Sequence, residues 1–220
     1  MNKPVSLIIA RHGETAFNES AMGDDQRIRG WRDLPLTAQG RKDAEELADK
    51  VSGMPIEEIF SSDLIRAEDT AKMVAEQFGL PVVVTMKLRP WNLGLMTGKP
   101  AKEVTETMDK FVTNENIKVP SGESFRDFLE RLLPFVARMA HKAHTDNKTI
   151  LLCTHTRCLQ ACKAWIAAGA GPDLKIDRAT MDDYSHESGT GGYIEVLPHM
   201  ILGPEFKSDS LKEDPDAEEG

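Results

Sequence analysis

The strongest constraint on the fold is an apolar run near the start of the chain that ends abruptly in polar residues. The run Leu7-Ile8-Ile9-Ala10 is followed at once by Arg11 and His12. It predicts a buried strand, and residues just past the carboxyl end of such a strand lie where open α/β sheets bind ligands. Arginine matches phosphate oxygens with its fork of donors, and an imidazole can attack phosphorus. The pair indicates phosphate chemistry, although a structural Arg-His pair in a loop would look the same.

Two further segments repeat this arrangement. The strand-like run 56–61 leads to Arg66 in a helical stretch, and the apolar run 149–154 ends at His155. Three predicted strands thereby direct Arg11, His12, Arg66 and His155 toward one sheet edge. Two guanidinium groups and two imidazoles would hold a tetrahedral dianion and neutralise the charge on its oxygens during phosphoryl transfer.

Strand-like runs alternate with helical patterns along the chain. Strands are predicted at 5–10, 56–61, 82–84, 149–154 and 192–197, and helices at 38–51, 64–78, 100–112, 124–143 and 156–169. Thr37 is the expected N-cap of the first helix, and Pro134 is expected to kink or break the helix at 124–143. The alternation predicts an α/β fold, a three-layer sandwich with a mostly parallel sheet flanked by helices.

The length of 220 residues suits one α/β domain, which we place at residues 1–203. Residues 204–220 carry seven acids and two lysines, so they hold -5 of the net charge of -9 and form an acidic tail that is expected to be disordered. No basic surface pattern indicates nucleic acid binding. No run approaches the ~18 apolar residues of a membrane helix, and the first strand begins too early for a signal peptide. We therefore expect a cytoplasmic protein without a membrane partner.

The three cysteines allow two interpretations. Cys158 and Cys162 are four residues apart on a predicted helix, near Cys153 and His155, which is a possible metal-binding arrangement. The Cys-x₃-Cys spacing is not a usual zinc spacing, however, and free cysteines commonly act as small core hydrophobes. We predict no metal and no cofactor.

These motifs together resemble the signature of the histidine phosphatase superfamily, the phosphoglycerate-mutase-like proteins. The matching segments keep the family's order from about residue 5 to residue 197. They are Arg11-His12-Gly13-Glu14-Thr15 with Asn18, then 29–31, 35–40, 61–67, 120–124 and His155. The resemblance implies that His12 is the nucleophile and becomes a phosphohistidine. It also implies that Arg11, Arg66 and His155 bind the phosphoryl group, with Asn18 and Thr156 as substrate contacts.

Elementary chemistry assigns the same role to His12. A nucleophilic imidazole must keep one nitrogen unprotonated, and it does so when the other nitrogen donates to a backbone carbonyl. Neighbouring cations disfavour the imidazolium form and help to keep the attacking nitrogen free.

One departure from the family pattern concerns the general acid. Members commonly have a glutamate ahead of a Gly-x-x-x-Gly segment as proton donor to the leaving group, and here Pro90 stands in its place. In the acid-phosphatase branch an aspartate after the second histidine does this work, and here that residue is Thr156. General acid catalysis contributes about 10²–10⁴-fold, so its loss affects alkoxide leaving groups most.

Three interpretations of this gap remain open. The substrate is a phosphoramidate such as phosphohistidine, an acyl phosphate or an anhydride, which needs no dedicated acid. Alternatively, another residue donates the proton, or the protein binds a phosphorylated ligand with little turnover. The candidate donors are Glu14, Glu123, Asp182, Asp183, His186 and Glu187.

The sequence thus predicts a phosphatase that hydrolyses a phosphomonoester or phosphoramidate through a phosphohistidine on His12. The expected partner is a small phosphorylated substrate or a phosphoprotein. A weakly catalytic phospholigand-binding protein is the alternative, and a phosphoglycerate mutase fits less well because mutases must protonate and deprotonate hydroxyl groups. The candidate selectivity residues are Trp91, Asn92, Met96 and Phe111, of which Trp91 and Met96 are more readily explained as core. No oligomeric state is predicted.

Overall fold

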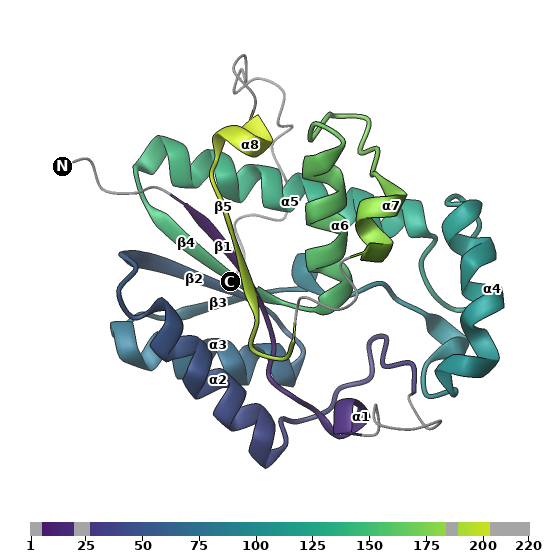
Figure 1. Cartoon of the computed structure of the whole chain (residues 1–220), viewed down its shortest axis with the longest axis horizontal. Coiled ribbons are helices and arrows are strands. Elements are labelled where there is room, and N and C mark those ends of the chain that lie inside the picture. Colours follow the sequence, from purple (N-terminus) through teal and green to yellow (C-terminus); the bar gives the residue numbers. More distant parts are fainter. Residues whose placement is uncertain (1–5, 20–26, 184–188, 203–220) are drawn as a thin grey trace.

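A five-stranded sheet forms the centre of the computed structural model, which describes residues 6–19, 27–183 and 189–202 (Figure 1). The strand order is β3-β2-β4-β1-β5. The first four of these strands are parallel to one another, and β5 pairs antiparallel with β1 at one edge. The prediction of an α/β fold with a mostly parallel sheet flanked by helices is confirmed.

The elements follow the predicted alternation. The strands are β1 (Leu7–Arg11), β2 (Ile56–Ser62), β3 (Val82–Thr85), β4 (Thr149–Thr154) and β5 (Tyr193–Val196). The helices are α1 (Ala16–Glu19), α2 (Ala38–Val51), α3 (Ile65–Phe78), α4 (Ala101–Thr113), α5 (Phe125–Asp146), α6 (Thr156–Ala167), α7 (Arg178–Asp183) and α8 (His199–Leu202). Two short 3₁₀ helices, η2 (Met86–Leu88) and η3 (Gly94–Met96), lie between β3 and α4.

Alternate residues of the central strands enter two separate cores. Ile8 and Leu151 pack with residues of α2 and α3 on one face of the sheet. Leu7, Ile9 and Leu152 pack with residues of α5 and α6 on the other. Both faces of β1 and β4 are therefore buried, which explains why these strands read as continuous apolar runs.

Local signals in the sequence set most helix boundaries. The Thr37 side chain accepts a hydrogen bond from the Gly40 N–H at 3.0 Å, so it caps α2 as predicted. Gly79 ends α3 in the left-handed conformation, with a φ of 64°. The predicted break at Pro134 is wrong, because α5 continues through it. Pro134 lies at an exposed position of α5, so its ring does not disturb the packing of the helix on the core.

All three cysteines are buried in the two cores. Burial raises the pKa of the Cys153 thiol to about 12 and that of Cys158 to about 11. Protonated thiols in an apolar core fit the small-hydrophobe interpretation and are poor metal ligands.

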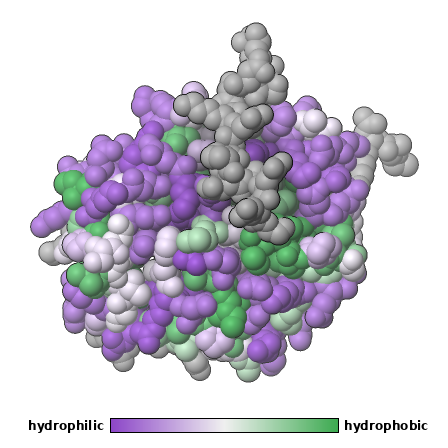
Figure 2. All heavy atoms as spheres, turned by 180° about the vertical axis from the view of Figure 1, so that it is seen from behind, coloured by the Kyte–Doolittle hydropathy of each residue, from purple (hydrophilic) through white to green (hydrophobic). Residues whose placement is uncertain are grey.

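The surface opposite the view of Figure 1 is mainly hydrophilic, with apolar side chains gathered in a few groups (Figure 2). Among the described helices, none combines the length and the apolar character that a membrane span needs. The acidic segment 204–220 lies outside the described residues.

Candidate active site

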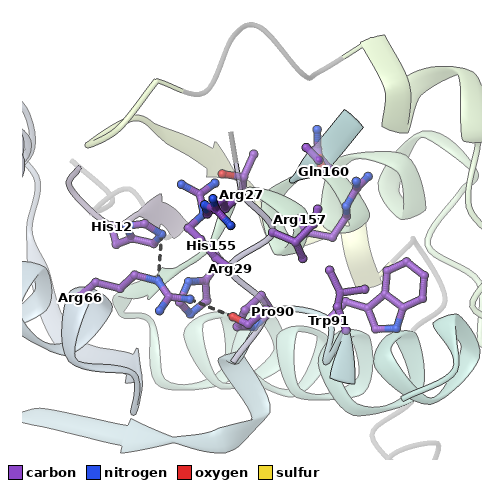
Figure 3. A pocket seen from close by; sticks show the side chains of 14 residues that line it. His12, Arg27, Arg29, Arg66, Pro90, Trp91, His155, Arg157 and Gln160 are labelled. Atoms are coloured by element: carbon purple, nitrogen blue, oxygen red, sulfur yellow. Dashed lines mark hydrogen bonds between the residues drawn. The ribbon is translucent and has the colours of Figure 1, made fainter. Parts of the chain in front are cut away.

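A cavity of about 250 Å³ lies at the carboxyl ends of β1 and β4 (Figure 3). Its wall carries four arginines, two histidines and no carboxylate among the residues that the structure describes. The residues that line it are His12, Arg27, Ile28, Arg29, Gly30, Arg66, Pro90, Trp91, Leu93, Ala101, His155, Thr156, Arg157 and Gln160. This is the sheet edge at which the sequence predicted a phosphate site.

Strand register brings the two histidines together. Arg11 at the end of β1 pairs with Thr154 at the end of β4, so His12 and His155 follow side by side. Their ring centroids are 5.1 Å apart in an edge-to-face arrangement. The convergence that the three apolar runs predicted therefore arises from parallel strands that end at the same level.

His12 has the arrangement of a neutral nucleophile. Its Nδ1 lies 2.6 Å from the carbonyl oxygen of Gly13, to which it donates, and this leaves the lone pair on Nε2. The side chain is only 1% exposed. Burial, followed by the charges of Arg66, Arg11 and Arg29, holds the pKa of His12 well below its usual value. The imidazole is thus neutral at neutral pH, with its proton on Nδ1 and a lone pair on Nε2.

Close backbone contacts fix the loop that carries His12. The His12 N–H donates to Thr154 O at 3.0 Å, and the Gly13 N–H donates to Thr70 Oγ1 at 3.1 Å. A Cβ on Gly13 would lie 2.1 Å from the carbonyl oxygen of Gly40, so α2 approaches this loop as closely as backbone atoms permit. The nucleophile is held from both sides.

Arg66, in the first turn of α3, reaches His12 directly. Its Nε donates to His12 Nε2 at 3.3 Å, and its other nitrogens donate to the carbonyls of Gly30 and Arg32 at 3.3 and 2.9 Å. Burial and the charge of Arg29 lower the pKa of Arg66 to about 10. The guanidinium therefore remains charged at the point where phosphoryl oxygens would surround His12 Nε2.

His155 presents a ring nitrogen that has no hydrogen-bond partner in the described part of the chain. Its Nε2 lies 3.0 Å from the Ser62 hydroxyl at the end of β2. Its Nδ1 is buried without a hydrogen-bond partner among the described residues. Burial and the charge of Arg66 hold the pKa of His155 well below its usual value. In the tautomer in which Nε2 accepts from the Ser62 hydroxyl, the ring proton is on Nδ1, where an anion would accept it.

Arg29 is a site residue that the sequence analysis placed only in a matching segment and gave no role. Its Nη1 is buried without a hydrogen-bond partner among the described residues. Burial lowers its pKa, and its charge in turn lowers the pKa values of His12, His155, Arg66 and Arg11. A buried guanidinium nitrogen that no described residue pairs with, in the middle of a cationic cluster, is the arrangement expected of an anion site.

Arg27, Arg157 and Gln160 also line the cavity and were not predicted. Arg27 belongs to a loop without periodic pattern, fixed where its Nη1 donates to Gly98 O at 2.9 Å. Arg157 and Gln160 lie in the first turns of α6, and Gln160 is only 6% exposed. Arg157 and Gln160 are three residues apart in a predicted helix that begins just after His155. Helical spacing places both on one face near His155, so the sequence could have indicated them.

The other predicted contacts lie as follows. Arg11 is outside the wall of the cavity, although its charge acts on His12, and burial with the charge of Arg29 lowers its pKa to about 10. Thr156 lines the cavity. Asn18 lies in α1, and its side chain is outside the described part of the structure.

Two of the candidate proton donors have structural contacts instead. The Glu14 carboxylate accepts from the Thr37 hydroxyl at 2.8 Å, and that of Glu123 accepts from Arg131 Nε at 2.8 Å and from Asn92 N at 3.0 Å. Neither residue is among the described residues that line the cavity. These contacts argue against Glu14 as the proton donor. The side chains of Asp182 and Asp183, and all of His186 and Glu187, are outside the described residues.

Pro90 lies on the wall at the position where the family pattern has its glutamate. Its carbonyl accepts from Trp31 Nε1 at 2.7 Å and from Arg131 at 3.1 Å. Trp91 lines the cavity but is 1% exposed and packs against Phe125 with ring centroids 5.0 Å apart. Of the other selectivity candidates, Met96 is buried, Phe111 packs against the core and Asn92 binds Glu123 through its backbone.

Comparison with known proteins gives concordant results. Residues 7–187 match the model of the histidine phosphatase superfamily (branch 1). The chain is 35% identical over 133 residues to the probable phosphoglycerate mutase GpmB of Yersinia enterocolitica, a match that covers 58% of this chain and 60% of that protein. The chain thus spans less than two thirds of the length of this curated relative.

Two solved structures are similar in fold. The mycobacterial glucosyl-3-phosphoglycerate phosphatase has a TM-score of 0.59 at 29% identity, and the match covers 73% of this chain and 78% of that one. A phosphoglycerate mutase from Thermus thermophilus has a TM-score of 0.61 at 26% identity, with 87% and 92% covered. Both hydrolysis and mutase activity are therefore represented among similar proteins.

Proposed function

Because the chain belongs to branch 1 of the histidine phosphatase superfamily, we propose that it is a phosphatase that transfers a phosphoryl group to His12 and then to water. The observation that carries the proposal is the neutral, buried His12 at the wall of a cavity with four arginines. A protein that only binds phosphate needs the arginines. It has no use for a neutral imidazole whose Nδ1 donates to a carbonyl and whose Nε2 keeps a lone pair.

In the first step, His12 Nε2 attacks phosphorus, and the bond from phosphorus to the leaving group breaks. Arg66 Nε lies 3.3 Å from Nε2 in the ligand-free site, so a phosphoryl oxygen that arrives there can take over this donor. Arg29 Nη1 and His155 Nδ1 supply two further donors that lack partners among the described residues. Prearranged donors of this kind stabilise the charge on the transferring group.

In the second step, water attacks the phosphohistidine, phosphate leaves and His12 is regenerated. The Nδ1 to Gly13 contact of 2.6 Å holds the ring in one orientation through both steps. The surrounding cations that lower the pKa of His12 favour the neutral imidazole as the group that leaves.

The described wall offers no carboxylic acid to protonate a leaving group. We infer a substrate whose leaving group departs without a strong acid, such as an activated phosphomonoester or a phosphoramidate. The same feature weighs against a phosphoglycerate mutase, although a mutase is among the similar structures. It also favours the second candidate, a phospholigand-binding protein with little turnover, which the experiment below distinguishes.

The test is hydrolysis of 4-nitrophenyl phosphate, an alkyl phosphate and a phosphoramidate by the purified protein. The His12→Ala variant removes the nucleophile, and His144→Ala, at an exposed position of α5, is the matched control. Turnover of the aryl phosphate and the phosphoramidate that is lost only in His12→Ala supports the proposal. Phosphate binding without His12-dependent turnover of any substrate would replace it with the binding protein.

A further inference from the structure

Two histidines line the cavity, and the segment that joins β2 to α3 contacts both of them. Arg66 Nε donates to His12 Nε2 at 3.3 Å, a contact that Figure 3 marks with a dashed line. The hydroxyl of Ser62, the last residue of β2, lies 3.0 Å from His155 Nε2. Ser62 is fully buried and is not among the described residues that line the cavity. Any effect of its hydroxyl on a bound phosphoryl group is therefore indirect, through His155.

Polar contacts on both sides of the turn after Ser62 hold it in place. The Asp63 carboxylate accepts from Arg89 Nε at 2.7 Å and from Arg89 Nη2 at 2.6 Å. The N–H of Ile65, the first residue of α3, donates to Asp33 Oδ1 at 2.8 Å. Because Ser62 is the chain neighbour of Asp63, these contacts fix the position from which its hydroxyl reaches the second histidine.

The hydrogen bonds of Ser62 show where its proton goes. A hydroxyl has one proton to donate, and its oxygen can also accept. Ser62 Oγ accepts from the N–H of Leu64, 3.4 Å away, where α3 begins. In the described part of the chain, its side chain has one acceptor, which is His155 Nε2. Because buried polar groups are hydrogen-bonded as a rule, Ser62 donates to Nε2, and Nε2 carries the lone pair.

This contact decides which nitrogen of His155 is a donor. A neutral imidazole has one N–H, so a lone pair on Nε2 places the proton on Nδ1. Burial and the charge of Arg66 hold the pKa of His155 well below its usual value, which keeps the ring neutral. Nδ1 is buried, and no described residue pairs with it. In the opposite tautomer, Nδ1 would direct a lone pair at phosphoryl oxygens, and the Ser62 proton would lose its acceptor.

The two histidines are thereby used in opposite ways. The Gly13 carbonyl accepts from His12 Nδ1 at 2.6 Å and leaves Nε2 as a nucleophile. Ser62 occupies Nε2 of His155 and leaves its Nδ1–H as a donor. Phosphoryl transfer to histidine needs one nucleophile and several donors to the oxygens of the transferring group. Two neutral imidazoles supply both only when a fixed partner sets the tautomer of each.

We propose that Ser62 is a positioning residue of the phosphatase, whose hydroxyl fixes the proton of His155 on Nδ1 and so makes this ring a donor to the transferring phosphoryl group. The consequence for catalysis rests on the proposed function, whereas the position of the proton is tested without turnover. Ser61 offers a matched control. It is also fully buried in β2, and its hydroxyl donates to the Ser62 carbonyl at 2.9 Å rather than to a histidine.

The first measurement is the nitrogen NMR spectrum of the His155 ring in histidine-labelled protein, because ring nitrogens with and without a proton differ widely in chemical shift. The His155→Gln variant assigns the signals. We expect a protonated Nδ1 and an unprotonated Nε2 in the wild type and in Ser61→Ala. In Ser62→Ala, the Nδ1 signal should move toward that of an unprotonated nitrogen, because the contact that selects the tautomer is gone.

The second measurement is hydrolysis of 4-nitrophenyl phosphate. We expect Ser62→Ala to lower kcat/KM about 10- to 100-fold, as the loss of a residue that orients a metal-binding histidine does. Ser61→Ala should leave kcat/KM unchanged. Each variant loses one buried hydrogen bond, so their losses of stability in urea should be similar. A merely structural role of Ser62 would thus lower the activity of both variants alike.

The outcomes separate this inference from the proposed function. A wild-type His155 with its proton on Nε2 overturns the inference, whatever the stability of the variants, and so does an unchanged tautomer in Ser62→Ala. Hydrolysis that depends on His12 and falls equally in Ser62→Ala and Ser61→Ala overturns the role of Ser62 and leaves the phosphatase standing. The expected tautomers without any His12-dependent hydrolysis overturn the phosphatase, and with it the catalytic role of the Nδ1 proton.

Discussion

At the scale of single residues, the main feature of the site is the repulsion between buried positive charges. Burial, and after it the charge of Arg29, lower the pKa values of Arg11 and Arg66 to about 10 in each case. The same charges keep His12 neutral. An anion relieves this repulsion, so the groups that make the empty site unfavourable are those that make phosphate binding favourable.

The pKa of His12 predicts the acid side of the pH profile. A protonated imidazole has no lone pair at Nε2, and the pKa of His12 lies well below 6.5 in the ligand-free site. We expect kcat/KM for 4-nitrophenyl phosphate, corrected for the titration of the substrate, to show no loss on acidification down to pH 6.5 and to fall only below it, since this parameter reports the free enzyme. A fall of kcat/KM on the acid side with its midpoint at or above pH 6.5 would contradict a neutral His12 in the free protein.

Replacement of Arg29 should lower the activity of the protein and raise its stability. We expect Arg29→Met to lower kcat/KM by about 10²–10³-fold, as for other lost donors to a transition state. Without ligand, the variant should unfold at a higher urea concentration, with a gain of about 1 kcal/mol, because a buried like charge is removed. Arg41→Met, at an exposed position of α2, serves as the control. Unchanged kinetics in Arg29→Met would remove this residue from the site.

At the scale of elements, the site depends on loops that are held by backbone contacts. The loop after β1 meets the start of α2 so closely that a Cβ on Gly40 would lie 2.0 Å from the carbonyl oxygen of Glu14. Four carbonyl oxygens of the segment 86–90 accept hydrogen bonds from Arg131, whose guanidinium also binds Glu123. Glu14, Gly40 and Arg131 are not among the described residues that line the cavity, yet their contacts hold the loop of His12 and the carbonyl of Pro90 in place.

The approach of α2 to the loop gives a test with a matched control. In Gly40→Ala, backbone atoms of Glu14 must move, because no flexible side chain can yield. We expect a loss of about 2 kcal/mol or more in the free energy of unfolding and a lower kcat, because His12 moves with the loop. Gly53→Ala has no atom within 4 Å of the new Cβ and should leave both unchanged. Equal stability of the two variants would contradict this close approach.

The ion pair of Glu123 with Arg131 gives a second test. Its side chains are 17% and 15% exposed, and a second Glu123 oxygen accepts from Asn92 N. We expect Glu123→Gln to lower the free energy of unfolding by about 2–3 kcal/mol, somewhat less than a fully buried pair would cost. Glu130→Gln breaks the exposed pair with Arg126, at 54% exposure of the carboxylate, and should cost about 0.5 kcal/mol or less. Urea unfolding that gives similar losses in the free energy of unfolding for Glu123→Gln and Glu130→Gln would refute the structural role of Glu123.

The elements also show what the sequence could and could not predict. His12 and His155 were predictable, because each ends a buried strand and parallel strands end at one edge. Arg29 and Arg27 were not, because they belong to a loop whose course is set by pairing with distant backbone, such as Ile28 N to Lys99 O at 2.9 Å. The break that Pro134 allowed does not occur, because the rest of α5 packs against the core and keeps the helix continuous through an exposed position.

At the scale of the whole molecule, net charge and local charge have opposite signs. The chain carries -9, yet the described wall of the cavity carries only cationic and neutral groups. Partial enclosure keeps the field of the guanidinium groups from being screened as it would be at an open surface. The protein can thus be acidic overall and still present a strong anion site.

Two buried neutral histidines make folding stability depend on pH. The pKa values of His12 and His155 are lowered in the folded state, so at acidic pH the unfolded chain binds protons that the folded chain does not. The free energy of unfolding should therefore be highest above pH 6.5 and fall below it, by up to about 1.4 kcal/mol per pH unit for each histidine. Urea unfolding between pH 7.5 and pH 5, about the range in which a histidine titrates, checks this.

The control for this prediction is a pair of variants. Replacing both His12 and His155 by glutamine should flatten the dependence on pH, whereas His144→Gln, at an exposed position, should not. An equal slope in the wild type and the double variant would mean that the two histidines titrate alike in the folded and unfolded chains.

The central claim is that His12 carries the phosphoryl group, and the most direct measurement is the intact mass of the protein quenched during turnover of 4-nitrophenyl phosphate. The account predicts a mass increase of one phosphoryl group that maps to His12, is lost in mild acid as a phosphohistidine is, and is absent from His12→Ala. Phosphate release by the wild type through a modification at another residue, or undiminished release by His12→Ala, would contradict it.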